Sequence, residues 1–131
     1  LWDRPLLPAT WMAPAGTLGA ALAVIGLAFT IWARKTLGQY WSRIVAVKEN
    51  HKLVQSGPYR VIRHPLYTGL LIAIPGTALA FGLWRCFIGA GLTCAAFLWR
   101  ARREDELLAG QFGAEFAAYR ARSGRLLPRW N

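Results

Sequence analysis

The sequence has few acidic residues, and long stretches of it carry no charge at all. Six Asp and Glu stand against 16 Lys and Arg, and no charged side chain occurs in 5–33, 65–84 or 86–99. A bilayer core of about 30 Å requires about 20 helical residues to cross it. The first two runs meet that length, so the gaps in charge favour an integral membrane protein.

The third uncharged run is shorter, but it is bounded by residues that suit a membrane interface. Trp84 and Trp99 can lie at the two interfaces, and Arg100 can extend its charge into the headgroups. We therefore predict an all-α, polytopic membrane protein of one domain, 1–131, with two of its helices forming a hairpin. The alternative is two spans and a half-buried hairpin arm. The predicted parts are helices at about 14–33, 65–84 and 86–109, a cytoplasmic loop at 34–64 and a cytoplasmic amphipathic segment at 110–131. The third helix is expected to continue past Trp99 into the cytoplasm.

The basic residues are confined to two blocks, which argues against a nucleic-acid role for the net charge of +10. Seven Lys and Arg lie in 34–63 and seven in 100–129, whereas only Arg4 and Arg85 lie elsewhere. Three crossings would put both blocks on the cytoplasmic side, as the positive-inside rule requires. Such blocks also suit anionic lipid headgroups. We expect membrane lipids and no nucleic acid as partners.

Cysteine and histidine are scarce, with two of each. Cys86 and Cys94 would lie about 12 Å apart along one helix, which is too far for a disulfide. With no histidine near them, we expect no metal site. The chain begins at Leu1, so we expect further sequence upstream, and the first apolar run is too long for a signal peptide.

The first polar cluster lies at the predicted start of the second helix. Arg63 and His64 directly precede Pro65, and Tyr67 follows on the same face as His64. Free N–H groups and the helix dipole make such a start a site for anions. The alternative is that Arg63 and His64 only anchor the helix to headgroups. Upstream, 43–54 has the pattern of a short interfacial hairpin, and 56–58 is a predicted turn.

The second cluster is acidic and lies just beyond the third apolar run. Glu104, Asp105 and Glu106 stand among basic residues and could simply balance surface charge. In a helical hairpin, however, the two far ends return to one place. His64 and Tyr67 should therefore face Glu104 across one small space. Leu108, Phe112, Phe116 and Tyr119 then recur at helical spacing and predict an amphipathic helix that ends at 123–124.

Three segments resemble the membrane-embedded isoprenylcysteine carboxyl methyltransferase family, and related phospholipid N-methyltransferases share much of the pattern. They are 36–42, GPYRVIRHPLYTG at 57–69, and EDELLAGQFGAEFAAYRARSGRLLP at 104–128. The resemblance implies S-adenosylmethionine as methyl donor, held in a cytoplasm-facing pocket capped by the C-terminal segment. It also implies a lipid substrate that enters from the membrane.

Carried over position by position, the resemblance assigns cofactor-binding roles to His64, Tyr67 and Gly69, and matches Glu104 to the first acid of the family's Glu-Glu pair. Asp105 stands where the second Glu is usual. Phe116 stands where the family usually has Tyr.

The predicted site combines this resemblance with the charges that the chemistry requires. Glu104 is suited to the cofactor's ammonium group, and Arg63 and His64 to its carboxylate. An acceptor carboxylate needs a cation from among Arg120, Arg122 and Arg125. We predict Glu104 and Arg120 as catalytic residues. The predicted cofactor-binding residues are Arg63, His64, Pro65, Tyr67, Gly69, Glu104, Asp105, Leu108 and Tyr119.

Several functions remain open from the sequence. The first acceptor is the carboxyl group of a prenylated cysteine or similar lipid, in a prokaryotic plasma membrane. The close alternatives are a small thiol and a phospholipid amine, which would need His64 as a general base. A sterol-reductase-like oxidoreductase and a non-catalytic membrane scaffold are the readings outside this class.

Overall fold

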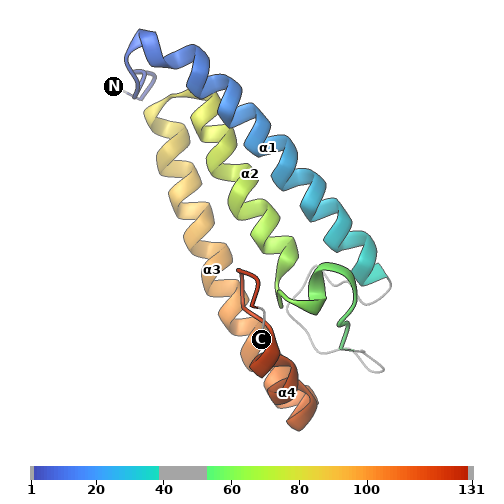
Figure 1. The fold of residues 1–131 in the computed structure, drawn as a ribbon. Coiled ribbons are helices and arrows are strands. Elements are labelled where there is room, and N and C mark those ends of the chain that lie inside the picture. The colour runs from blue at the N-terminus through green and yellow to red at the C-terminus, as the bar shows by residue number, and fades with distance from the viewer. Residues whose placement is uncertain (1, 39–52, 130–131) are drawn as a thin grey trace.

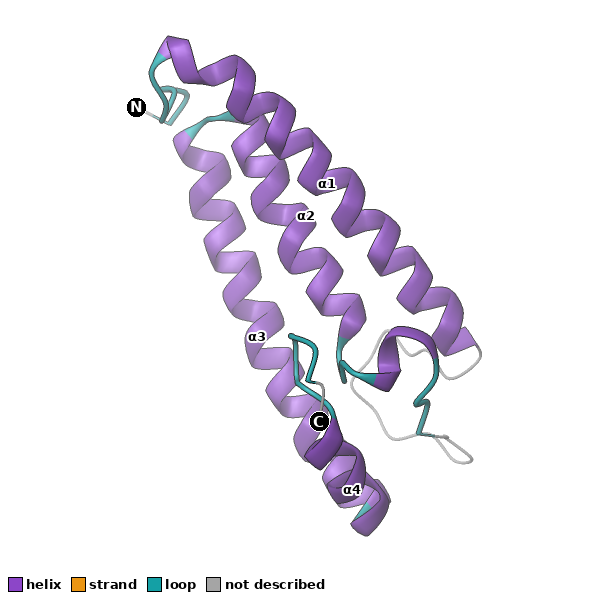
Figure 2. Cartoon of the chain, in the orientation of Figure 1, coloured by secondary structure: helices purple, strands orange, loops and turns teal. Residues whose placement is uncertain are grey.

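The computed structural model describes residues 2–38 and 53–129, and this part of the chain is almost wholly helical. Its elements are α1 (Ala9–Leu37), the 3₁₀ helix η2 (Gly57–Arg60), α2 (Pro65–Phe81), α3 (Trp84–Phe112) and α4 (Ala114–Arg122). The described residues contain two isolated β-bridges and no strand. The three long helices form an elongated bundle, and α4 folds back beside the end of α3 (Figure 1). Figure 2 shows how little of the described chain is loop.

The predicted helices are present, but glycine and proline set their ends more than charge does. The first helix was expected at 14–33. It begins earlier because Pro8 is the extended N-cap residue, and it continues through Arg34 and Lys35 to Gly38, where φ is 54°. A charged side chain does not stop a helix, whereas a residue in a positive-φ conformation does.

The same reason corrects the predicted boundary between the second and third helices. Gly82 adopts the left-handed conformation and ends α2 at Phe81, so the turn lies at 82–83. Trp84 and Arg85, predicted to form the turn, are the first residues of α3. The N-terminal segment closes this end of the bundle, where Leu6 N–H donates to Gly82 O at 2.7 Å and Asp3 pairs with Arg85.

The amphipathic segment was predicted as one helix, and this is wrong. Gly113, with φ at 52°, separates α3 from α4. The predicted apolar face is nevertheless assembled by the fold: Phe116 and Tyr119 form a buried cluster with Leu53, against which Leu108 and Phe112 pack. The helix ends at Arg122, as predicted, and the turn predicted at 56–58 forms the start of η2. The hairpin predicted at 43–54 lies almost wholly outside the described residues.

Helices α1 and α2 approach so closely that only glycine fits at two levels of their interface. A Cβ added to Gly26 would lie 2.5 Å from Gly69 O, and one added to Gly19 would lie 2.5 Å from Gly76 O. The two pairs are seven residues apart on each helix. Closer to the C-terminal end of α1, Thr30 donates its hydroxyl to Leu66 O at 3.3 Å. Small residues of this kind allow close helix packing in lipid.

Length and composition identify one described helix, α1, as long and apolar enough to cross a membrane. Helix α2 is apolar but has 17 residues. The fold therefore supports a membrane-embedded helical protein, while the predicted number of crossings remains a prediction.

Candidate active site

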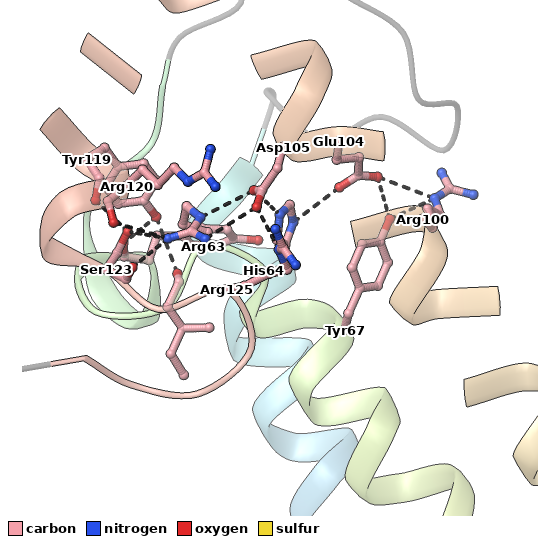
Figure 3. A network of polar contacts seen from close by, with 12 residues as sticks. Arg63, His64, Tyr67, Arg100, Glu104, Asp105, Tyr119, Arg120, Ser123 and Arg125 are labelled. Carbon is pink, nitrogen blue, oxygen red and sulfur yellow. Dashed lines mark hydrogen bonds and ion pairs between the residues drawn. The ribbon is translucent and has the colours of Figure 1, made fainter. Parts of the chain in front are cut away.

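The polar side chains predicted to meet do so where α2 begins, where α3 emerges from its uncharged run and where the C-terminal segment returns. Figure 3 shows this cluster. Its parts are held by backbone pairing: Arg63 N–H donates to Gly124 O at 2.8 Å, and His64 N–H donates to Arg125 O at 3.0 Å. Thr68 adds a hydroxyl bond to Leu126 O at 2.7 Å. These bonds join residues about 60 positions apart in the chain.

Asp105 is the centre of the cluster and is 4% exposed. Its carboxylate accepts from Arg63 Nε and Nη2, both at 3.3 Å, and from Arg125 Nε at 2.8 Å. His64 Nε2 lies 2.7 Å from the same carboxylate. Burial alone would raise the pKa of Asp105, but the bonds from His64 and Arg125 hold it well below its usual range. Asp105 is thus a charged anchor already saturated by the protein's own cations.

His64 has a carboxylate at each ring nitrogen. Opposite the Asp105 contact, Nδ1 lies 3.4 Å from Glu104 Oε2. Burial alone would lower the pKa of His64, but the hydrogen bonds to Asp105 and Glu104 outweigh it and raise the pKa. The arrangement therefore favours a buried imidazolium, which donates from both nitrogens and has none left to accept a proton.

Glu104 forms a second, more open group with Tyr67 and Arg100. Tyr67 donates its hydroxyl to Glu104 Oε1 at 2.5 Å, and Arg100 Nε lies 2.7 Å from the Tyr67 hydroxyl and 3.3 Å from Glu104 Oε1. The side chains of Glu104 and Arg100 are 25% and 32% exposed, against 5% for Asp105. Burial would raise the pKa of Glu104, but the bonds from His64 and Tyr67 lower it. An anion and a cation thus lie side by side, within reach of a ligand.

Tyr67 is itself held between two rings. His64 stacks against it with a centroid distance of 5.8 Å and an interplanar angle of 21°, while Phe97 of α3 lies at 5.3 Å. Contacts of this kind are typical of offset aromatic pairs. The tyrosine hydroxyl is therefore aimed at Glu104 by packing from both helices.

Arg63 stabilises the C-terminal segment as well as Asp105. Its Nη1 donates to Ser123 O at 2.5 Å and to Arg120 O at 3.4 Å, which satisfies carbonyls at the end of α4. The Arg120 side chain is exposed, and Arg120 contacts the cluster through this backbone carbonyl. In the described contacts, the guanidinium of Arg63 is thus bonded to groups of the protein itself.

The other predicted site residues lie at varied distances from this cluster. Pro65 is fully buried at the start of α2. Gly69 packs against the backbone of Gly26, on the side of α2 that faces α1. Tyr119 donates its hydroxyl to Tyr59 O at 2.6 Å and, with Leu108, belongs to the apolar cluster around Leu53. A binding role for these four residues remains a prediction.

Sequence reasoning missed Arg100 as a member of the site. The signal was present, since Arg100 lies one helical turn before Glu104 and opposite charges at that spacing form pairs. Arg125, named among three candidates, reaches the cluster through Asp105. Among the described residues, no group of three His, Cys, Asp or Glu is arranged to hold a metal ion.

Comparisons with known proteins identify relatives of this chain. The chain is 35% identical over 137 residues to the cobalt-zinc-cadmium resistance protein CzcN of Cupriavidus metallidurans, an alignment covering 98% of this chain and 54% of that protein. It is 30% identical over 111 residues to protein-S-isoprenylcysteine O-methyltransferase B of Arabidopsis thaliana, covering 79% and 54%. The chain thus spans about half the length of these curated relatives.

A solved structure shares the fold. The eukaryotic intramembrane Ras methyltransferase ICMT superposes with a TM-score of 0.77 at 24% identity, covering 88% of this chain and 44% of that one. The family model of isoprenylcysteine carboxyl methyltransferases matches residues 19–110. This range begins within α1, ends within α3 and includes the Glu104–Asp105 pair. The chain belongs to the isoprenylcysteine carboxyl methyltransferase (ICMT) family.

Proposed function

We propose that this protein transfers a methyl group from S-adenosylmethionine to the carboxyl group of a prenylated cysteine or a similar lipid. Family membership supports the reaction class, and relatives in plants and yeast are named protein-S-isoprenylcysteine O-methyltransferases. The identity of the acceptor is inferred from the geometry of the polar cluster.

The observation that supports a carboxylate acceptor is the position of His64 between two carboxylates. An amine acceptor must lose a proton, which requires a base with a free lone pair. His64 has Asp105 at one ring nitrogen and Glu104 at the other. A carboxylate, in contrast, is already ionised at neutral pH and needs no base.

The chemistry of the exposed residues fits the amino-acid part of the methyl donor. Glu104 would hold its ammonium group, which leaves Arg100, a cation of similar exposure beside Glu104, for the acceptor. When bound, S-adenosylmethionine would supply an already activated methyl group. The protein then has to bind the two reactants, align them and exclude water, which is worth about 7–11 kcal/mol of barrier.

For the acceptor carboxylate, we propose Arg100 as the first cation and keep Arg120 as a second candidate. Arg100 lies where the uncharged run of α3 ends, so a lipid chain can remain on the apolar side while its carboxylate reaches the guanidinium. Arg120 is exposed on α4 and would need to turn toward the cluster. Arg63 and Asp105 act as positioning residues that hold His64 and the C-terminal segment.

We further propose that α1, α2 and α3 all cross the membrane, as one domain with its polar site toward the cytoplasm. The exposed arginines around the site support this orientation, because cytoplasmic loops are rich in Arg and Lys. They include Arg102, Arg103, Arg120 and Arg122. Similarity to a Cupriavidus protein supports a prokaryotic plasma membrane.

The proposal is tested by cofactor binding and methyl transfer on purified full-length chain in detergent. We expect calorimetric binding of S-adenosylmethionine that is lost in Glu104→Ala, and methylation of N-acetyl-S-farnesyl-cysteine that is lost in Arg100→Ala and Glu104→Ala. Phosphatidylethanolamine serves as the competing acceptor. Transfer to that amine, with none to the carboxylate, would contradict the proposed acceptor. An absence of cofactor binding would contradict the proposed methyltransferase activity.

A further inference from the structure

Phe97 lies on the face of α3 that leads to the polar cluster. It precedes Arg100 by three residues and Glu104 by seven, a spacing that puts all three on one side of the helix. The axial step from Phe97 to Arg100 is only about 4.5 Å. Phe97 belongs to the uncharged run 86–99, so it stands on the apolar side of the boundary that Arg100 begins.

Phe97 also touches the cluster directly. Its ring centroid lies 5.3 Å from that of Tyr67, at an interplanar angle of 37°. The hydroxyl of the same Tyr67 contacts both Glu104 and Arg100. Phe97 is therefore an apolar residue that adjoins the polar site, and it remains partly exposed despite this contact.

We propose that Phe97 is a specificity-determining residue, which contacts the acceptor's lipid chain next to the thioether. This inference rests on the proposed function. An acceptor whose carboxylate reaches Arg100 must leave its chain on the apolar side of that residue. The partly exposed ring one turn away then meets the atoms nearest the cysteine. The far end of the chain lies beyond its reach.

The position of the contact predicts which chemical feature is recognised. In a prenyl thioether the first isoprene unit carries a branching methyl group and a double bond, whereas a straight alkyl thioether has neither. Phe97 should therefore distinguish prenyl from alkyl chains of equal length. It should not distinguish two prenyl chains that differ only at their far ends.

The test compares kcat/KM for three acceptors in the full chain: N-acetyl-cysteine carrying S-farnesyl, S-geranylgeranyl or straight S-dodecyl groups. In Phe97→Ala we expect the farnesyl-to-dodecyl ratio to fall about three- to tenfold, the size of an aromatic contact. Phe97→Leu, which preserves bulk and protects folding, should shift the ratio in the same direction. The geranylgeranyl-to-farnesyl ratio and the calorimetric Kd for S-adenosylmethionine should stay within twofold of wild type, taking about twofold as no change.

Phe87→Ala is the matched control, because Phe87 is a partly buried aromatic on the same helix, near its N-terminal end. Both ratios should be unchanged in that variant. An unchanged farnesyl-to-dodecyl ratio in both Phe97 variants, in an active protein, would overturn this inference and leave the proposed function standing. A wild type inactive on all three acceptors would overturn both.

Discussion

At the scale of single residues, Glu104 and Asp105 are neighbours in the chain with different surroundings. Asp105 is buried and bound by Arg63, His64 and Arg125, whereas Glu104 keeps a quarter of its side chain exposed. The shorter acid thus has the structural position and the longer acid faces the space where a ligand can reach it. Consecutive residues on a helix point about 100° apart, which is why one pair can face two environments.

Neutralising Asp105 should destabilise the fold far more than neutralising Glu104. Asp105→Asn leaves three cationic groups without their buried partner, and we expect a loss of about 3–5 kcal/mol in the free energy of unfolding. Glu104→Gln should remain folded and lose cofactor binding. Denaturation in detergent, followed by the intrinsic tryptophan signal, measures the free energy of unfolding of both variants.

Glu106→Gln provides the control for this comparison. Glu106 pairs with Arg103 at 2.8 Å, but both side chains are more than half exposed. An exposed pair is worth about 0–1 kcal/mol, so the variant should unfold like wild type. Equal loss in the Asp105 and Glu106 variants would contradict the central position of Asp105.

The charge on His64 predicts a pH dependence of stability. Its folded-state pKa is raised above the ordinary 6.5, so the stabilisation is fully present below 6.5 and is lost as pH rises through the folded value. Asp105, whose pKa is lowered from 3.8, acts in the opposite sense: its contribution is present above 3.8 and is lost as pH falls toward the lowered value. Glu104, Asp105 and Tyr67 are the groups that face His64.

We therefore expect the melting temperature of wild type to decline as pH rises above about 6.5 toward alkaline values. His64→Gln should remove this alkaline decline and keep the acid one, because the amide does not titrate. Thermal unfolding across the pH range measures both limbs. Wild-type and variant curves with the same alkaline slope would refute a charged His64.

At the scale of elements, the interface of α1 and α2 depends on glycine, while α3 does not. A Cβ at Gly26 would meet Gly69 O and Ala73 N at 2.5 Å, and these are backbone atoms that cannot turn aside. Gly89 and Gly91 on α3 have no atom within 4 Å of such a Cβ. Glycine is therefore required for close packing at the α1–α2 interface, whereas an added methyl group at these two positions of α3 would meet no neighbouring atom.

Gly26→Ala should force α1 and α2 apart and cost about 1–3 kcal/mol, the usual cost of overpacking. Gly89→Ala is the matched control, and should be neutral or stabilising by up to about 1 kcal/mol through helix propensity. Melting temperatures of the two variants in one detergent provide the measurement. A Gly26→Ala protein as stable as the Gly89→Ala protein would contradict the close approach.

Helix ends show what local sequence can and cannot indicate. Pro65 as the first residue of α2 was predicted correctly, because its ring favours that position. The ends at Gly38, Gly82 and Gly113 were missed, although glycine is the residue that a positive φ favours. Charge boundaries mark the membrane surface better than they mark the end of a helix.

At the scale of the whole molecule, the hairpin of α2 and α3 separates two ends of different character. One end holds the 82–83 turn, to which the N-terminal segment is hydrogen-bonded, and the other holds the start of α2 and the C-terminal segment (Figure 1). The polar cluster lies at this second end (Figure 3). If all three helices cross the bilayer, these two ends face opposite compartments.

Single-cysteine labelling tests this topology. With Cys86 and Cys94 replaced by Ala, Arg85→Cys should react with an impermeant thiol reagent only from outside the cell. Arg103→Cys, on the exposed surface of α3, should react only after the membrane is opened. Reaction of both from one side would mean that the hairpin enters the membrane without crossing it.

The sequence by itself determined the helical membrane class, the grouping of basic residues and the meeting of His64 and Tyr67 with Glu104. These follow from hydrophobicity, helical period and the return of a short hairpin, all of which are local. Only the tertiary structure decided that Asp105 is the saturated anchor, that Arg125 joins the cluster while the Arg120 side chain is exposed, and that Gly69 faces α1. Such partnerships depend on distances between residues 20 to 60 positions apart, which only packing of the helices brings within hydrogen-bond range.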